Sequence, residues 1–415
     1  MRATPTQRQD GAARDARKPA CRAWGRAALA AGLIAAAIGI VGGCGGGVDS
    51  GGTGAPVAGS YAAGPISGFG SVIVGDVHYD ERNAAISDAD GNARSRDDLK
   101  LGMTIEVNGT PVVTDASGLS SSTASTIVYA SALLGPVTAV DVSLNRLTVL
   151  GQTVDVGAAT VFDASAAGGV ASLAVGDIVE VYALPDYAAA RYVATRIERR
   201  AAPPAAYTIR AAIGNLDTAA RTYMLGALAV SYAGADVGAA TLANGRIVEA
   251  WLATAPVAGV WQATRVRDAS PQIRDHDESR IEGLVTAFTS SNQFSVAGVA
   301  IDARNAEFPD GRAGIVLETR VRVEGTASAS GLTATRVELR NDDAQQDEFE
   351  LDGPIATLDA AAHTFTVRGV VVRYTDAVDF RDGTAADLAV GRQVEVRGPL
   401  SADGTEVAAT RIRFR

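Results

Sequence analysis

The chain has 415 residues, of which 47% are hydrophobic and only 5% aromatic, and it contains 45 glycines. This composition supplies enough apolar residues for folded cores, but it favours several small β-rich domains over one large enzyme core. The formal net charge is −10 at pH 7. Binding to a phosphate backbone needs clustered positive charge, so we expect no nucleic-acid partner.

Residues 1–43 have the pattern of an export signal. Seven basic residues lie among the first 26, and the apolar segment AALAAGLIAAAIGIV follows at 27–41. This segment is too short and too rich in alanine for a membrane-spanning helix. The motif VGGC at 41–44 resembles a bacterial lipobox, in which the cysteine is lipidated and becomes the mature N-terminus. We therefore expect a lipoprotein signal peptide and lipidation of Cys44; an ordinary export signal with an incidental cysteine is the alternative.

Residues 44–63 are rich in glycine and predict a flexible tether. Gly45 stands where an aspartate would retain a lipoprotein at the inner membrane, so we expect the outer membrane, with the body facing the periplasm or the cell surface. The second cysteine, Cys21, belongs to the predicted signal peptide. The folded body is therefore expected to have no disulfide and no thiol site.

The rest of the chain repeats a unit of about 70 residues five times. The first unit opens with GPISGFGSVIV at 64–74 and contains LKLGMTIEVNG at 99–109, and the later units carry similar blocks. The last four units close with ATRI or ATRV. We place the five repeats at 64–131, 135–200, 207–268, 278–340 and 349–415.

The fifth repeat predicts the fold most clearly. Val394 and Val396 alternate with Glu395 and Arg397, which is typical of a strand with one buried face. Three strands, a short helical linker and two more strands have the element order of an OB-fold. We therefore expect an all-β protein of five tandem small OB-like β-barrels, each with about five strands and a short helix. A unit of this size can bury its own core, so the barrels should behave as separate beads.

The repeated ATRI phrase has a structural explanation. Its arginine should pair across a hairpin with a glutamate of the preceding strand, and such pairs contribute about 0.2–1 kcal/mol each. The expected pairs are Glu180 with Arg196, Glu249 with Arg265, and Glu395 with Arg411.

The blocks GPISGFGSVIVGDVHYD at 64–80 and DDLKLGMTIEVNG at 97–109 resemble a bacterial family of domains of unknown function (number fifty-six sixty-six). Repeats two to five match the pattern more loosely and lack the GFGS element. The resemblance covers essentially all of the chain after the tether. It implies an exported, β-rich, often lipidated protein and brings no known activity, so it implies no catalytic residue.

Motifs for catalysis and for metal binding are missing from the sequence. His78, His276 and His363 lie in different repeats without ligand spacing, so we expect no zinc site. The segment DADGN at 88–92 is similar to the start of a calcium loop but lacks the distal glutamate, and a turn explains it equally well. There is no GxSxG elbow, phosphate loop or evident carboxylate pair. We therefore expect neither an enzyme nor a cofactor.

Trp251 and Tyr182 are the candidate ligand-binding residues. Both align with positions expected to face outward from a barrel. An exposed aromatic ring can stack on a sugar or anchor a partner protein. Packing between neighbouring barrels is the alternative explanation.

These observations predict a non-catalytic, lipid-anchored protein of the cell envelope that serves as an interaction or spacer scaffold. Its partners would be the membrane, through the N-terminal lipid, and envelope proteins or glycans. Weak sites repeated along one tether would raise the overall strength of binding. The alternative is a carbohydrate-binding envelope protein that uses exposed aromatic barrel faces.

Overall fold

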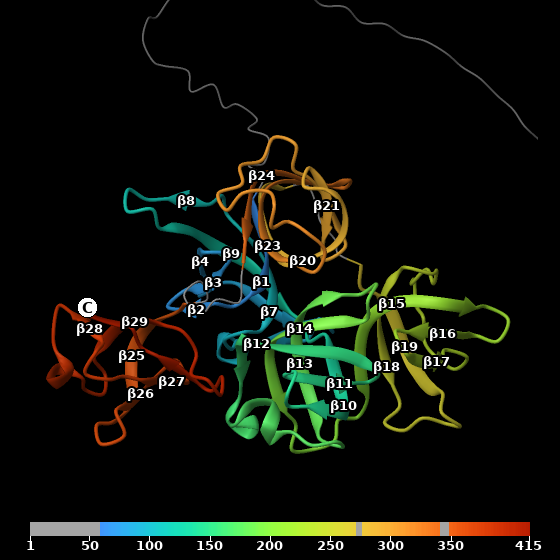
Figure 1. The fold of residues 1–415 in the computed structure, drawn as a ribbon, viewed down its shortest axis with the longest axis horizontal. Helices are drawn as coiled ribbons and strands as arrows, with labels where there is room; N and C mark the ends of the chain where they lie inside the picture. The colour runs from blue at the N-terminus through green and yellow to red at the C-terminus, as the bar shows by residue number, and fades with distance from the viewer. Residues whose placement is uncertain (1–58, 271–275, 341–347) are drawn as a thin grey trace, which may run out of the picture. The chain divides into compact units, whose positions relative to one another are not determined.

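The computed structural model describes residues 59–270, 276–340 and 348–415, which form strands joined by turns and short 3-10 helices (Figure 1). The predicted signal peptide, Cys44 and most of the predicted tether lie outside the described residues. The first strand, β1, spans Ser60–Pro65 and so begins inside the segment expected to be tether. In the described residues no helix is long and apolar enough to cross a membrane.

The second repeat shows how each barrel closes. Its five strands are β10 (Leu133–Asp141), β11 (Arg146–Val149), β12 (Gln152–Phe162), β13 (Ile178–Asp186) and β14 (Arg191–Arg199). β10 pairs antiparallel with β11 and with β13, β12 pairs antiparallel with β11 and parallel with β14, and β13 pairs antiparallel with β14. The 3-10 helices η2 (Ala164–Ala166) and η3 (Gly169–Ser172) lie between the third and fourth strands, where a short helix was expected.

The same circuit of pairings recurs in the third and fourth repeats. The third has β15 (Tyr207–Asp217), β16 (Thr222–Leu225), β17 (Leu228–Ser231), β18 (Ile247–Leu252) and β19 (Trp261–Asp268). The fourth has β20 (His276–Ser290), β21 (Gln293–Val296), β22 (Val299–Asp302), β23 (Arg320–Ser328) and β24 (Gly331–Leu339).

In the fifth repeat the third and last strands of the circuit are each broken in two, and in the first repeat the first and third strands are. The fifth has β25 (Phe349–Asp359), β26 (Thr364–Val367), β27 (Val370–Arg373), β28 (Asp379–Arg381), η4 (Ala385–Asp387), β29 (Gln393–Gly398), β30 (Glu406–Ala408) and β31 (Arg411–Phe414). The first has β1, β2 (Gly68–Phe69), β3 (Val72–Val74), β4 (Val77–Asp80), β5 (Ala85–Asp88), β6 (Ala93–Arg94), η1 (Arg96–Asp98), β7 (Thr104–Gly109), β8 (Val113–Thr114) and β9 (Ser120–Tyr129). The protein is therefore all-β and built from small OB-like barrels.

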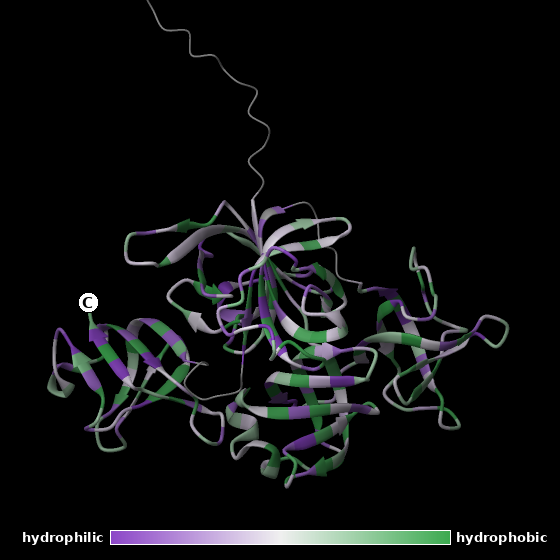
Figure 2. Ribbon diagram, turned by 45° about the horizontal axis from the view of Figure 1, so that its top comes forward, coloured by the Kyte–Doolittle hydropathy of each residue, from purple (hydrophilic) through white to green (hydrophobic). Residues whose placement is uncertain are grey.

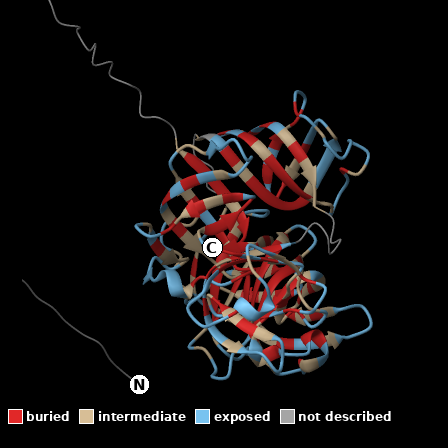
Figure 3. Cartoon of the chain, turned by 90° about the vertical axis from the view of Figure 1, so that its left-hand side faces the viewer, coloured by how far each residue is buried: buried red, intermediate tan, exposed pale blue. Residues whose placement is uncertain are grey.

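Alternation along the strands places the cores. In β4, Val77 and Tyr79 are fully buried, whereas His78 and Asp80 between and after them are only partly buried. Figures 2 and 3 show the same banding, with hydrophobic and buried residues recurring along the ribbons. A period of two puts one set of side chains into a barrel and the other onto its outside.

The hairpin register differs from the expected one by two residues. Glu395 lies opposite Arg413 rather than Arg411, and Glu249 lies opposite Arg267. A shift of two residues keeps every side chain on the same face, so alternation alone cannot distinguish the two registers. Beside the ATRI or ATRV motif of repeats two to four, the structure has a β-bulge that sets the observed register.

Strand pairing also joins one repeat to another. β1 pairs in parallel with β20, β2 pairs in parallel with β25, and β10 pairs antiparallel with β15. The expectation of barrels that behave as separate beads is therefore wrong, because hydrogen-bonded first strands connect them. Sequence periodicity describes the inside of each barrel and carries no information about which outer edges meet.

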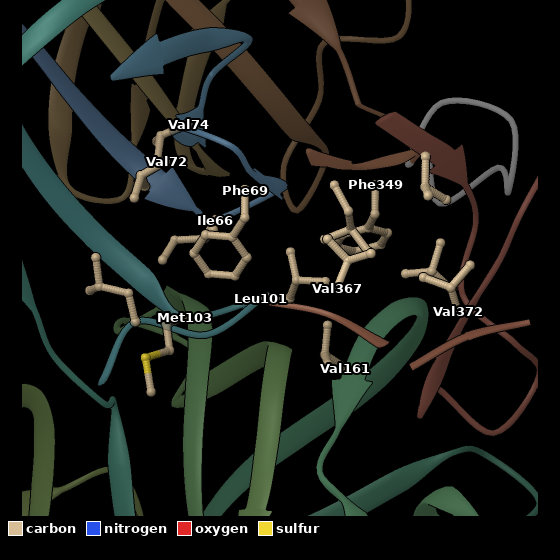
Figure 4. Close-up of a cluster of buried hydrophobic side chains, with 14 of the residues drawn as sticks. Ile66, Phe69, Val72, Val74, Leu101, Met103, Val161, Phe349, Val367 and Val372 are labelled. Atoms are coloured by element: carbon tan, nitrogen blue, oxygen red, sulfur yellow. The ribbon is translucent and has the colours of Figure 1, made fainter. Parts of the chain in front are cut away.

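Hydrophobic cores also cross the repeat boundaries. Figure 4 shows Phe69 and Leu101 of the first repeat near Phe349 and Val367 of the fifth, with Val161 of the second repeat beside them. Phe69 is 2% exposed, and full burial of a phenylalanine contributes about 1.5–3 kcal/mol. Contacts between repeats therefore add to the stability of the barrels themselves.

Candidate functional site

A cleft of about 790 Å³, which we call the polar cleft, lies between the first repeat and the fifth. One wall consists of β4, Ser71 and the hairpin at 110–123. The other wall consists of the outer faces of β25 and β29 together with Arg413 and Arg415. In the first barrel, β3 and β4 occupy the second and third strand positions, and this is the face on which OB-folds bind oligonucleotides and oligosaccharides.

His78 lies on the first wall because β4 turns its even-numbered residues outward. The Nδ1 atom of His78 is 3.2 Å from the hydroxyl oxygen of Ser71. Burial lowers the pKa of His78, and the positive charge of Arg397 lowers it further. The imidazole is therefore neutral at pH 7 and can donate one hydrogen bond and accept another.

Hydroxyl groups line the hairpin side of the cleft. The Ser122 hydroxyl donates to the carbonyl oxygen of Thr110 at 2.7 Å, and the amide of Thr123 donates to the Thr110 hydroxyl at 3.1 Å. Val113 and Leu119, on the two arms of the same hairpin, are 65% and 41% exposed. This wall therefore combines polar groups with accessible aliphatic surface.

The second wall is a ladder of carboxylates and guanidinium groups. Arg397 lies 2.8 Å from Glu350, and Arg415 lies 2.7 Å from Glu395 and 3.1 Å from Asp352. Burial raises the pKa of Glu350. The positive charge of Arg397 opposes this rise, and the nearby carboxylates of Glu395 and Asp352 add to it. Burial alone would also raise the pKa of Glu395, but the hydrogen bond and charge of Arg415 lower it.

Two further acidic residues lie where β4 ends. Asp80 accepts hydrogen bonds from the side chain and backbone of Arg82, which lower the pKa of Asp80 to about 2. Glu81 is 3% exposed and lies 3.3 Å from Arg368 and 3.6 Å from Arg96. Both carboxylates are therefore held by arginines.

The charges lining the polar cleft balance. The acidic residues are Asp80, Glu81, Glu350, Asp352 and Glu395, and the basic residues are Arg82, Arg96, Arg397, Arg413 and Arg415. The cleft thus offers paired donors and acceptors without a net charge, although the whole chain is acidic. Such a surface suits a neutral ligand with many hydroxyl groups better than a polyanion.

Ser71 and His78 are also a nucleophile and a base within hydrogen-bonding distance. A catalytic triad needs a third group that orients the base. In residues 59–270, 276–340 and 348–415, no carboxylate is hydrogen-bonded to the ring of His78. The contact therefore lacks the orienting partner of a triad.

Trp251 is not exposed as expected. It is 8% exposed, and the guanidinium carbons of Arg265 and Arg267 lie 3.6 and 4.7 Å from its ring centroid. Asp90, from the DADGN segment of the first repeat, forms an ion pair with Arg265. The bulged register places Arg265 directly opposite Trp251, and this stacking covers the ring.

Tyr182 is also buried rather than exposed. It is 1% exposed and packs in a core cluster that contains residues of the first repeat. Its hydroxyl lies 3.4 Å from Glu180, and burial raises the pKa of Tyr182. Neither Tyr182 nor Trp251 lines the polar cleft. Ligand binding by either residue stays a prediction. That prediction depended on exposed aromatic rings, and both rings are buried.

The remaining histidines make ring contacts. His276 stacks on Tyr61 with centroids 5.6 Å apart, and His363 stacks on Tyr374 at 5.1 Å. Among the described residues no group of three histidine, cysteine, aspartate or glutamate side chains could hold a metal ion.

The DADGN segment forms ion pairs and hydrogen bonds. Asp88 accepts hydrogen bonds from Asn92 at 3.0 Å and from Arg94 at 2.6 Å. These bonds lower the pKa of Asp88 against the opposing effect of burial. The carboxylates of the segment thus pair with arginines, Asp88 with Arg94 and Asp90 with Arg265.

The GFGS element at 68–71 marks the cleft, and the sequence pattern alone did not reveal its role. Gly68 and Phe69 pair with Glu350 and Leu351 of β25. Gly70 has a φ of +146°, and a Cβ atom there would lie 2.5 Å from that of Asp352. Only glycine allows the fifth repeat to approach so closely. The presence of the element in the first repeat alone was the sequence signal that could have indicated this role.

Comparison with known proteins identifies the family. A family model described as Domain of unknown function (DUF5666) matches residues 135–198, 282–338 and 352–413. The solved structure "drosophila Unr CSD456" matches at 15% sequence identity and covers 51% of this chain and 98% of that chain, with a TM-score of 0.13. No curated protein matched the chain. The model matches the second, fourth and fifth repeats, which shows that the chain contains repeated domains of the DUF5666 family.

Proposed function

We propose that this protein is a non-catalytic, lipid-anchored scaffold of the cell envelope, in which five OB-like barrels form one binding body. The observation that carries the proposal is the pairing of first strands between repeats, β1 with β20 and β2 with β25. Strand pairing fixes the register of two barrels, which a flexible linker cannot do. A joined body can present a fixed surface to a partner.

Buried ion pairs support the joined body. Glu282 of the fourth repeat is held by Arg320 at 2.6 Å and by Arg322 at 3.2 Å. Arg322 is 2% exposed and also pairs with Asp76 of the first repeat. Separation of these repeats would break the ion pair between the buried Arg322 and Asp76, although Arg322 would keep Glu282 of its own repeat as a partner.

The export signal and Cys44 supply the location in this proposal. The basic segment, the apolar segment and the VGGC motif predict a lipid on Cys44, a tether and an outer-membrane anchor. Metabolic labelling with an alkyne analogue of palmitate tests this directly. We expect label on the wild-type protein in the envelope fraction and none on Cys44→Ser. Equal labelling of both proteins, or no labelling of the wild type, would overturn the anchor.

Carbohydrate binding is the second candidate, now supported by the polar cleft instead of exposed aromatic rings. Balanced carboxylates and guanidinium groups, with hydroxyls on the facing hairpin, can pair with the hydroxyls of a neutral glycan. We expect Arg397→Met to weaken binding on a glycan array at least tenfold, and Arg304→Met, an exposed arginine outside the cleft, to leave it unchanged. Absence of glycan binding by the wild type would reject this candidate and leave the scaffold untouched.

A further inference from the structure

A second and largely apolar pocket lies where the first four repeats meet. It has a volume of about 150 Å³, and we call it the apolar pocket. Its aliphatic lining includes Ala63, Ile105, Val128, Leu184, Ile281 and Val299. An engineered cavity of about 150 Å³ with a similar lining holds one benzene molecule. The pocket therefore has room for a ligand with one compact apolar group.

Two polar pairs reach the same pocket. Tyr61 lies beside Glu106, and Tyr187 lies beside Arg210; all four residues line the pocket. Burial raises the pKa of both tyrosines. An apolar pocket with a few convergent polar groups is the usual form of a small-molecule site, and such sites often lie between domains.

Arg210 has an unused hydrogen-bond donor. Its Nε atom is buried and has no hydrogen-bond partner among the described residues. The ion pair between Arg210 and Glu249 is long, with 3.7 Å between the charged atoms. A buried donor without a partner is unfavourable, so an acceptor from a ligand would stabilise this arginine. A carboxylate can accept this hydrogen bond and also pair with the positive charge of Arg210.

We propose that the apolar pocket binds a small monocarboxylate with a compact apolar body, whose carboxylate accepts a hydrogen bond from Arg210. Glu106 and Glu282 also line the pocket, and their carboxylates disfavour a second carboxylate on the ligand. The aliphatic wall contacts the apolar body of the ligand. This site is separate from the scaffold role and from the polar cleft.

Calorimetric titration of the purified protein with four probes of equal ring size tests the proposal. The probes are benzoate, phthalate, benzyl alcohol and benzylamine. We expect saturable binding of benzoate with one site per chain, and at least tenfold weaker binding of the other three. A preference for benzylamine would assign the pocket to Glu106 and overturn the proposal, as would the absence of saturable benzoate binding.

Variants then locate the site. Arg210→Met should remove the preference for benzoate over benzyl alcohol, and Ala130→Phe should fill the pocket and abolish binding of both. Ala239→Phe, at an exposed position outside the pocket, is the matched control and should bind benzoate as the wild type does. Benzoate binding that persists in Ala130→Phe would overturn the proposal, and circular dichroism shows that each variant is folded.

Discussion

Arg265 stacks its guanidinium group on the indole ring of Trp251, with 3.6 Å between the Arg265 Cζ atom and the ring centroid. The two residues are cross-strand partners in the β18–β19 hairpin, and Asp90 of the first repeat pairs with the same arginine. The recurrent arginine of the ATRV motif thus covers an aromatic ring and contacts another repeat. In the third repeat the arginine of this repeated motif therefore has a structural role in packing.

The contact between Arg265 and Trp251 is expected to contribute modestly to stability. A cation–π contact is worth about 0.5–2 kcal/mol, depending on how far it is desolvated. We expect Arg265→Ala to lower the free energy of unfolding by about 1 kcal/mol and to increase quenching of tryptophan fluorescence by acrylamide. Arg304→Ala removes an exposed arginine that pairs with Asp302 and is the control. Equal quenching of both variants would show that Arg265 does not cover the ring.

The buried Glu282 predicts an acid-sensitive stability. Burial opposes ionisation of Glu282, but the charges of Arg320 and Arg322 lower its pKa from 4.5 to about 2. Because the folded-state pKa lies below the unfolded one, this stabilisation is fully present above pH 4.5 and is lost as the pH falls to about 2. We expect a loss of about 3 kcal/mol over that range, measured by urea denaturation at a series of pH values.

Two variants separate Glu282 from other carboxylates. Glu282→Gln should lower the free energy of unfolding at pH 7 by about 3–5 kcal/mol, because two arginines lose a buried partner. It should also flatten the acid dependence. Glu307→Gln, whose side chain is 79% exposed, should change neither quantity. The account of Glu282 is wrong if its variant keeps the full acid dependence of the wild type.

Gly68 is expected to be essential for the joint between the first and fifth repeats. A Cβ atom at Gly68 would clash with the backbone oxygen of Glu350, to whose strand β2 is paired. We expect Gly68→Ala to lower the free energy of unfolding by about 1–3 kcal/mol and to speed amide exchange in β25. Gly214→Ala is the matched control, because its added methyl group would lie 3.9 Å from the backbone oxygen of Met224, an ordinary contact. Unchanged exchange in β25 would contradict the joint.

Covalent labelling of Ser71 tests the proposal that the protein is non-catalytic. Its hydroxyl contacts His78 at 3.2 Å, but the described residues supply no orienting carboxylate to that ring. We expect no covalent labelling by a fluorophosphonate probe, read by mass spectrometry of the intact protein. Labelling that is lost in Ser71→Ala and kept in Ser67→Ala would show an activated serine and contradict the non-catalytic account.

The sequence predicted the inside of each barrel well. Alternation in segments such as 393–398 indicated strands with one buried face, and the element order indicated the OB-like barrel. Both properties depend on neighbours along the chain. The bulges beside Trp251 and Tyr182 could not be predicted, because a shift of two residues preserves the alternation.

Contacts between repeats were harder to predict than the barrels. Trp251 and Tyr182 occupy positions that face outward in a single barrel, yet both are buried. Two arginines cover Trp251 and pair with Asp90 of the first repeat, while Tyr182 packs among residues of the first repeat. The GFGS element was the one local signal of such a contact, because its glycines are needed only where β25 approaches.

Small-angle X-ray scattering of the mature Cys44→Ser protein is the most direct test of the central claim that the barrels form one joined body. The account predicts a profile that a single rigid arrangement of the described residues reproduces, and a broader profile for Gly68→Ala. A wild-type profile that requires several barrels moving independently on linkers would contradict it.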